Sequence, residues 1–491
     1  MAAGLQGICH IILDGLDEYA GISSSQRSSE SNIMKVICLE EFPECRVLVT
    51  TRPHLENFFD QDDLPRVYTK MWIEGFSRES SYEYINKFFA STSIPDRGRD
   101  LEVYLDEQPL IDELVKTPLF CLMICHVWSE GLLDSGTTTQ TGLLDKVNVF
   151  LMHYANERSK SSVKITQEKL KEVIHQLGEV ALTGLLDDAK QLVFTPHDFR
   201  KVPATLDMAC ELGIVSKTTG NITRLPQSNE TTSTTIEFYH KLAQEHSAGK
   251  FLADQTNRFL LHLKISKLDR VLRKIKANIC DYENLIRFAA GTDNILCIRI
   301  MKALLKNSFL DESERYRILL DCSSETTGTQ GNVSSLVQRC VNAERIVLKS
   351  PTVYTVVGMQ NLPKQLKRQV MTVMFEGSTL ATDVTTGLWS CLGSFSMLHT
   401  LTISDSSLSF HPSTHELPSQ LTRIELKAPS TLPSEKTSVS TETMSGLGLL
   451  IGEETKNLQW LILTRVKCTD EEDLVQLVEC CKNVKTMNHL M

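Results

Sequence analysis

The chain has 491 residues, of which 41% are hydrophobic and 23% are charged, as is usual for globular proteins, and its length favours about three domains. A net charge of −10 argues against nucleic acid as the main partner. The chain opens without a basic and apolar leader, and its longest strongly apolar stretch, residues 119 to 128, is too short to span a bilayer. We therefore expect a cytoplasmic protein without a membrane span.

Cysteine usage points to the same compartment. The 14 cysteines are scattered and lie mostly among apolar residues, as in Phe120-Cys121-Leu122. This pattern favours free thiols in a reducing environment over a disulfide framework. No paired Cys and His spacing is typical of a zinc site.

An apolar run near the N-terminus ends in three carboxylates. Ile11 to Leu13 predict a strand buried on both faces of a parallel sheet, and Asp14, Asp17 and Glu18 follow it. Carboxylates beside a buried strand are costly unless a cation or hydrogen bonds receive them. P-loop nucleotidases use such acids to hold magnesium and to orient an attacking water. The alternative is a chance apolar strand that ends in acidic turn residues.

A second apolar strand, Cys45 to Thr51, is followed by Arg52, and residues 33 to 39 between the two strands have helical spacing. Strand, helix and strand predict a βαβ unit with a right-handed crossover. The segments LDGLDE (13–18) and VLVTTRP (47–53) resemble Walker B and sensor 1 of the NACHT domain, the nucleotide switch of NOD-like receptors. The resemblance implies that Asp14 holds magnesium, that Asp17 and Glu18 orient the hydrolytic water, and that Arg52 senses the γ-phosphate.

The next segments predict a third strand and a helix. Val67 to Ile73 has strand character, and Gly-Phe-Ser follows it, as in the NACHT family. Ser77 is a candidate N-cap for a helix that runs through Tyr84 and Phe89.

Residues 101 to 128 have helical patterning with a break at Thr117-Pro118, so Pro118 should open the second helix. The surrounding Lys-Thr-Pro-Leu-Phe resembles the family motif in which this proline packs on the adenine ring. An ordinary helix-starting proline is the alternative.

The middle of the chain predicts helices followed by a two-stranded wing. Residues 143–158 and 165–186 have amphipathic helical patterns, and a further helix ends at Gly213. Two short strands, 214–216 and 236–239, flank a Ser/Thr/Asn/Gly stretch that we expect to be a flexible loop. This order is typical of a winged-helix domain.

The wing runs into Phe-Tyr-His-Lys-Leu-Ala-Gln-Glu-His (238–246), which resembles the segment of NOD-like receptors that contains a nucleotide-binding histidine. The matching residue is His240, with Gln244, Glu245 and Ala248 in register. The resemblance implies that His240 reaches the β-phosphate of bound ADP and holds a closed state. A histidine satisfied within the core is the alternative.

Residues 250 to about 320 are predicted to be helical, and 322–335 a Ser/Thr/Gly linker. The C-terminal third repeats the spacing L-x-x-L-x-L, which predicts one short strand per repeat of a degenerate leucine-rich solenoid. The spacing recurs at 343–353, 370–380, 398–408, 421–426 and 458–468. Thr469 to Glu472 is a capping box for a convex helix. An irregular α/β domain is the alternative.

The glycine-rich loop G-x-x-x-x-G-K-[ST], which cradles phosphates, is not found in this sequence. The chain is therefore expected to be either a fragment of a larger receptor or a protein that has lost tight nucleotide binding. ATP or ADP and Mg²⁺ are expected as cofactors only if this loop is supplied, and enzymatic activity is at most a weak regulatory ATPase.

The expected fold class is α/β plus α: part of a NACHT-type P-loop sheet, helical and winged-helix domains, and leucine-rich repeats. The expected boundaries are 1–95, 96–141, 142–249, 250–335 and 336–491 in that order, with a small helical domain second and a larger one fourth. One functional hypothesis is a nucleotide-gated innate immune receptor that oligomerises. The other is a nucleotide-independent scaffold that binds protein partners through its helical domains and leucine-rich repeats.

Overall fold

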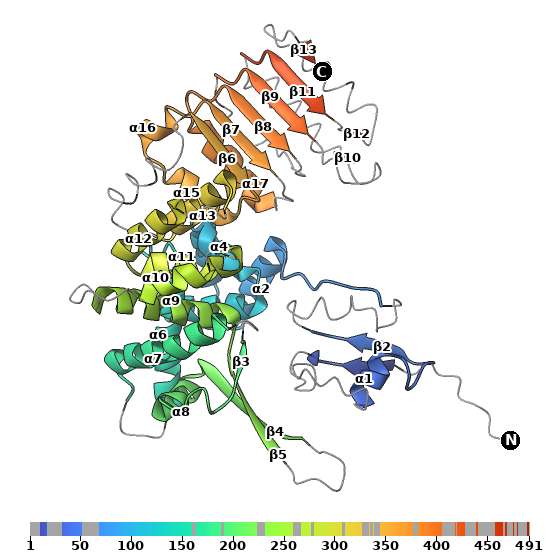
Figure 1. Cartoon of the computed structure of the whole chain (residues 1–491), viewed down its shortest axis with the longest axis vertical. Coiled ribbons are helices and arrows are strands. Elements are labelled where there is room, and N and C mark those ends of the chain that lie inside the picture. The colour runs from blue at the N-terminus through green and yellow to red at the C-terminus, as the bar shows by residue number, and fades with distance from the viewer. Residues whose placement is uncertain are drawn as a thin grey trace, which may run out of the picture. The chain divides into compact units, whose positions relative to one another are not determined.

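The structure is a computed structural model of the whole chain, in which two compact units, Met1–Gly75 and Phe76–Met491, are each described by themselves (Figure 1). The described residues are 10–16, 32–51, 68–159, 164–187, 191–222, 231–258, 267–275, 279–306, 310–326, 333, 337, 344–376, 382–404, 418, 420–427, 438–439, 457–464, 467–468, 475, 479 and 489–490.

The first unit is a small βαβ arrangement. Strand β1 (His10–Leu13) pairs in parallel with β2 (Arg46–Val49), and helix α1 (Asn32–Ile37) lies between them in the sequence. Parallel strands need such a crossover connection. Leu16 and Ile37 form the buried centre, with the inward-facing side chains of the strands around them. The predicted strand–helix–strand order is confirmed.

The prediction that the first strand is buried on both faces is wrong. Burial alternates along β1 and β2, and Ile12 and Leu48, which are partners in the register, are 66% and 46% exposed. In the described part of this unit a helix packs on one face of the sheet only. The other face therefore remains in contact with solvent.

The predicted third strand at 67–73 is also corrected. Val67 lies outside the described residues, and 68–73 have no strand structure. Trp72 and Ile73 are 61% and 93% exposed, while Tyr68 packs on the small core and donates its hydroxyl to the Ile37 carbonyl at 2.9 Å. Strand character needs a neighbouring strand to complete its hydrogen bonds, and the sheet described here consists of β1 and β2.

The second unit begins with four helices: α2 (Arg78–Ala90), α3 (Arg97–Glu107), α4 (Pro109–Val115) and α5 (Pro118–Ser129). The Ser77 hydroxyl accepts the Ser80 amide at 3.1 Å, so the predicted N-cap is confirmed. Pro118 occupies the first position of α5, as predicted. Sequence reasoning missed the additional break before Pro109, another proline at a helix start.

Three further helices and a small antiparallel sheet follow. Helices α6 (Gln140–Arg158), α7 (Gln167–Leu185) and α8 (Pro203–Leu212) match the predicted helices, and Gly213, with a φ of 74°, ends α8. The sheet has the order β3-β5-β4, from β3 (Val193–Phe194), β4 (Val215–Ile222) and β5 (Thr231–Phe238).

The expectation of a flexible loop at 217–235 is wrong at both of its ends. Strands β4 and β5 extend to Ile222 and Thr231, and they pair along their whole length, with Thr219 opposite Thr234. Threonine is β-branched and favours strands, and an antiparallel ladder satisfies the backbone without an apolar core. Residues 223–230 lie outside the described part.

A run of helices leads to the C-terminal sheet: α9 (Lys241–Arg258), α10 (Lys267–Ile275), the 3₁₀ helix η4 (Ile279–Tyr282), α11 (Glu283–Thr292), α12 (Asn294–Leu305) and α13 (Glu312–Ser324). The linker predicted from Cys322 is corrected at its start, because Cys322, Ser323, Ser324 and Glu325 are all buried. The hydroxyls of Ser323 and Ser324 donate hydrogen bonds to carbonyls one turn earlier in α13, so these buried hydroxyls have hydrogen-bond partners within the helix.

The C-terminal region contains a parallel sheet in the order β13-β11-β9-β8-β7-β6, with its central strands side by side in Figure 1. These strands are β6 (Arg345–Lys349), β7 (Thr372–Glu376), β8 (Thr400–Ser404), β9 (Arg423–Lys427), β11 (Trp460–Thr464) and β13 (His489–Leu490). A separate parallel pair joins β10 (Ser438–Val439) and β12 (Lys467–Cys468). The helices of the region are α15 (Val353–Gln360), α16 (Lys364–Lys367) and α17 (Thr382–Gly393).

The strand predicted for each repeat is found. Five buried residues stand next to one another across the sheet: Ile346, Val373, Leu401, Ile424 and Leu461. The capping box at 469–472 lies outside the described residues.

Candidate nucleotide site

The turn after β1 is fastened to the end of β2. The Thr50 hydroxyl donates to Asp14 Oδ1 at 2.5 Å and accepts the Gly15 amide at 2.9 Å. The Leu16 amide donates to the Thr50 carbonyl at 2.9 Å, and Gly15 has a φ of 72°, a conformation that favours glycine. The exposed Asp14 carboxylate thus lies at the carboxyl end of two parallel strands, where ligands of open α/β sheets bind.

Of the other residues predicted for this edge, Asp17, Glu18 and Arg52 lie outside the described part of the chain. Thr51, next to Arg52, has a buried hydroxyl oxygen for which the structure gives no hydrogen-bond partner. Sequence reasoning missed both threonines at the end of β2. The signal was present, because two hydroxyls follow an apolar strand directly.

Pro118 starts α5 at an exposed position in the second unit. The residue before it, Thr117, has extended backbone and makes no side-chain cap to the helix. Two residues further, Phe120 is fully buried. In the first turn of α5, the proline is therefore exposed to solvent and the phenylalanine packs in the core.

His240 lies between β5 and α9, and it packs edge-to-face on Phe120 with 4.9 Å between the ring centroids. Its Nδ1 accepts the Leu242 amide at 3.1 Å, which leaves the proton of the neutral imidazole on Nε2. An Nε2–H is the kind of donor that a phosphate oxygen accepts. The structure thus brings His240 into contact with Phe120, in the first turn of the helix that Pro118 opens.

The residues that follow His240 in the matching segment serve packing. Gln244 is buried and donates its amide to the Gln191 carbonyl at 3.0 Å. Glu245 is also buried and accepts from Asn284 at 3.0 Å, and this burial raises the pKa of its carboxyl. These contacts fix α9 against its neighbours and so fix the position of His240 at its start.

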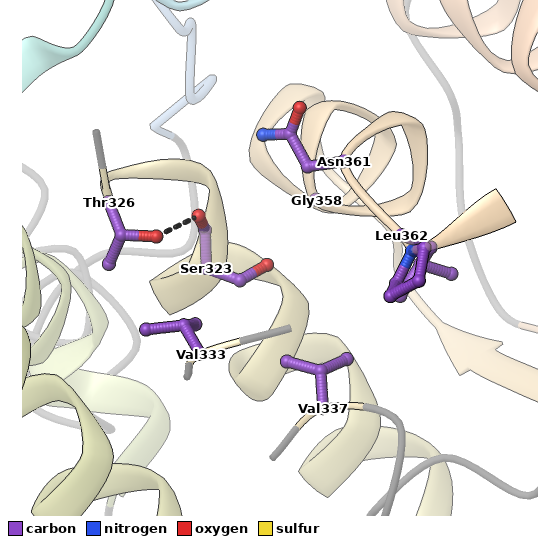
Figure 2. A pocket seen from close by; sticks show the side chains of 8 residues that line it. Ser323, Thr326, Val333, Val337, Gly358, Asn361 and Leu362 are labelled. Atoms are coloured by element: carbon purple, nitrogen blue, oxygen red, sulfur yellow. Dashed lines mark hydrogen bonds between the residues drawn. The ribbon is translucent and has the colours of Figure 1, made fainter. Parts of the chain in front are cut away.

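A small pocket lies elsewhere, between the ends of α13 and α15. Figure 2 shows Ser323 and Thr326 on the α13 side, where the Thr326 hydroxyl donates to the Ser323 carbonyl at 2.8 Å. Gly358 and Asn361 line it on the α15 side. Neither Pro118 nor His240 lines this pocket.

Within the described residues, the structure gives no group of three or more His, Cys, Asp and Glu side chains that could hold a metal ion. The eight cysteines whose side chains are described form no disulfide bond with one another. In the same part of the chain, no helix combines the length and the apolar character needed to cross a membrane.

Comparison with known proteins finds distant relatives of the chain. No family model matches it. It is 24% identical over 219 residues to the mouse (Mus musculus) proteins "Baculoviral IAP repeat-containing protein 1g" and "1f", a match that covers 45% of this chain and 14% of each relative. It is 22% identical over 330 residues to "NLR family CARD domain-containing protein 4" of Xenopus tropicalis, which covers 64% of this chain and 29% of that protein. The chain thus matches less than a third of the length of these relatives and has a distant similarity to an NLR family protein.

Proposed function

We propose that this chain is part of a NOD-like receptor-type signalling protein of the cytoplasm, in which an adenine nucleotide controls oligomerisation. The observation that carries the proposal is the contact of His240 with Phe120, two residues after Pro118. Pro118 and His240 are far apart in the sequence and each resembles a separate nucleotide-binding motif, and the contact of His240 with Phe120 supports a shared role for them. The distant similarity to an NLR family protein supports the same class.

Pro118 and His240 of the second unit have the chemistry that an adenine nucleotide needs, and the acidic turn of the first unit has the chemistry that its magnesium ion needs. The exposed ring of Pro118 would lie against the adenine, and the Nε2–H of His240 would donate to the β-phosphate. Asp14 has the oxygen donors that Mg²⁺ prefers. Asp17 and Glu18 would orient a water, and Arg52 would match the γ-phosphate with its planar guanidinium. The magnesium would neutralise phosphate charge.

The C-terminal sheet supplies the second half of the proposal. Its in-register strands and their spacing support leucine-rich repeats, with one strand per repeat. A repeat surface of this kind and the helices before it would bind protein partners. The signalling role in innate immunity follows from the NLR resemblance.

A nucleotide-independent scaffold is the second candidate. It is favoured by the bond between Thr50 and Asp14 Oδ1, which gives the carboxylate a role in the turn that needs no ligand. The sequence also has no glycine-rich loop. In this reading the same helices and repeats bind partners, and the acidic turn has a structural role.

ADP release distinguishes the two candidates. The protein to use is the chain joined to a preceding segment that carries a glycine-rich loop. A charge-assisted hydrogen bond contributes about 1.5–3 kcal/mol, so His240→Leu should speed ADP release by about one to two orders of magnitude.

A matched control is His175→Leu, because His175 also packs on a phenylalanine, Phe251, at 4.9 Å between ring centroids. It should leave the release rate unchanged. If the protein fails to bind ADP at all, or if both variants release it at the wild-type rate, the scaffold is the better candidate.

A further inference from the structure

A buried arginine lies where four elements of the second unit meet. Arg287 on α11 is 4% exposed, and its guanidinium carbon lies 3.2 Å from the ring centroid of Tyr354 on α15. Its Nη2 donates to Asn284 Oδ1 at 2.8 Å and to Gln140 Oε1 at 3.3 Å. Gln140 is the first residue of α6, so one side chain contacts α6, α11 and α15.

A buried glutamate completes the group. Glu325, which directly follows α13, accepts the amide of Thr141 at 3.0 Å and its hydroxyl at 2.7 Å. A carboxylate at this place satisfies a free amide of the first turn of α6 and lies favourably at the positive end of the helix dipole. We call Arg287, Tyr354, Gln140, Thr141 and Glu325 the Arg287 cluster.

The helix that brings Tyr354 is fixed to α13 and to the sheet. Gly358 on α15 lies so close to α13 that a Cβ there would stand 2.3 Å from the Leu320 carbonyl oxygen. Asp321 on α13 accepts the hydroxyl of Thr355 at 2.5 Å. Helices α15 and α16 form the connection from β6 to β7, so α15 is joined in the chain to the first strand of the sheet.

On the other side, the cluster is fixed to the helices of the candidate nucleotide site. Helix α6 follows α5 in the chain, and side chains of α5, α6 and α11 share one apolar core that includes Phe120, Leu143 and Phe288. This core also holds the Tyr239 side chain beside His240. The Arg287 cluster therefore joins the start of α6, beside this core, to α11, α15 and the end of α13.

The cluster is incompletely satisfied in the arrangement described. Arg287 Nε and Glu325 Oε1 are buried, and the structure gives neither atom a hydrogen-bond partner. A buried ionic group contributes little net stability. A buried atom without a hydrogen-bond partner raises the free energy of the closed arrangement, which makes an opened arrangement, in which water reaches that atom, easier to populate. An apolar contact of the same size would carry no such cost.

We propose that the Arg287 cluster is a releasable contact that holds α15 and the C-terminal sheet against the start of α6. When it opens, α15 and the first strands separate from the start of α6, while α2 to α6 keep the apolar core that includes Phe120 and Leu143. The inference does not require that a nucleotide binds, so it stands or falls separately from the proposed function.

Hydrogen exchange of the full chain tests the proposal. In Tyr354→Leu, which removes the ring under Arg287, amides of α15 and of residues 141–143 should exchange about tenfold faster or more, because local opening becomes more frequent. Amides of α7 and α9 should keep their wild-type rates. Tyr354→Phe keeps the ring and loses only the hydroxyl that hydrogen-bonds to Arg287, so its exchange should lie between that of the wild type and that of Tyr354→Leu.

A second variant displaces α15 from its other support, α13, and leaves the side chains of the Arg287 cluster unchanged. Gly358→Ala places a methyl group against the Leu320 carbonyl and should give the same local pattern in α15. The matched control is Arg78→Met on α2, which removes an arginine that also lies over a tyrosine, Tyr82, and is paired with two aspartates. It should leave α15 and residues 141–143 unchanged.

Two results would overturn the proposal. Equal acceleration in α7, α9 and α15 would mean that the cluster is an inseparable part of the core. Wild-type exchange in α15 of both Tyr354→Leu and Gly358→Ala would mean that the cluster holds nothing that can open.

Discussion

Asp14 is an exposed carboxylate with one oxygen held by Thr50 and its place fixed at the end of a parallel strand pair. The hydrogen bond orients the side chain, and it leaves the second oxygen outside that bond. Such a carboxylate suits a magnesium ion with several waters, which is how proteins usually bind it. If Asp14 is a magnesium ligand, its second oxygen faces the ion or one of its waters. If Asp14 is only a turn residue, the hydrogen bond from Thr50 is its whole role.

We predict that Asp14→Ala lowers magnesium-nucleotide affinity in the chain joined to a glycine-rich loop. Loss of a metal-ligating or ligand-orienting group typically costs about ten- to a hundredfold in affinity. Titration with nucleotide in the presence and absence of magnesium gives the comparison. Thr50→Val, which removes the turn bond and keeps the carboxylate, should cost less. Equal affinity of Asp14→Ala and wild type would make Asp14 a turn residue only.

Asp321 provides a prediction for pH. Burial raises the pKa of its carboxyl from an ordinary 3.8 to about 6, against the lowering effect of Arg317 and the Thr355 hydroxyl, and Glu283 adds to the rise while Arg287 opposes it. The folded state therefore binds this proton more tightly than the unfolded state. Its contribution to stability is fully present below pH 3.8 and is lost as the pH rises through about 6.

We expect Asp321→Asn to be less sensitive to pH than the wild type between about pH 4 and 6. The pKa difference corresponds to about 3 kcal/mol at pH 7 as an upper bound. Urea unfolding at several pH values measures it, and Arg317 keeps Glu283 as a partner in the variant. Parallel stability curves for the two proteins would contradict the assignment.

At the scale of elements, Gly178 and Gly213 are needed for two different reasons, close helix packing and a left-handed helix end. Gly178 on α7 faces α9, where a Cβ would stand 2.3 Å from the Ser247 carbonyl oxygen and 2.6 Å from Phe251 Cβ. Gly213 has open space around it, and glycine is favoured there because the backbone adopts a left-handed φ of 74° where α8 ends. One glycine allows two helices to touch, and the other allows a chain reversal.

Gly178→Ala should destabilise the second unit more than Gly213→Ala. Overpacking against a backbone costs typically 1–3 kcal/mol or more, because a whole helix must shift. A left-handed residue with a Cβ costs about 1–2 kcal/mol. Thermal unfolding of the two variants under the same conditions tests the order, and a larger loss for Gly213→Ala would show that α7 and α9 can separate at little cost.

At the scale of the whole molecule, the two units differ in the size of their cores. The described core of the first unit has two fully buried side chains, Leu16 and Ile37, with a few half-buried neighbours. A two-stranded sheet with so little apolar cover is marginally stable. The second unit has extensive buried clusters that run from α2 to β11.

We predict that amides of β1 and β2 exchange with solvent faster than those of α6 and α7 by several orders of magnitude. Local opening of a marginal unit costs little, whereas a core helix exchanges only through large-scale unfolding. Hydrogen exchange on the purified chain measures both. Equal protection of the two regions would show that the first unit has stabilising contacts beyond those described.

The second unit should fold without the first. The Phe76 amide donates to the Lys116 carbonyl at 2.7 Å and its ring lies 5.9 Å from that of Tyr84, so the boundary residue belongs to the helical part. A protein that starts at Phe76 should unfold at the same temperature as the full chain, and the calorimetric trace shows this directly. A lower temperature would mean that residues 1–75 support the helices.

Local sequence patterns determined most of the elements. The sequence predicts Ser77 as an N-cap and Pro118 as a helix start because caps and proline act on their own backbone, within a turn of the chain. The apolar alternation at Ile346, Val373 and Leu401 predicted strands because the side-chain period of a strand is local. These signals need no knowledge of what lies across the fold.

Only the tertiary structure decided which surfaces are covered. The sequence of β1 is equally suited to burial on one face or on two. In the structure α1 packs on one face only, and Ile12 on the opposite face is exposed. The contact of His240 with Phe120 and the bond between Thr141 and Glu325 join residues far apart in the chain, the latter pair separated by 184 positions. Such pairs leave no periodic trace in a single sequence, because the free energy that selects them arises only when distant segments pack.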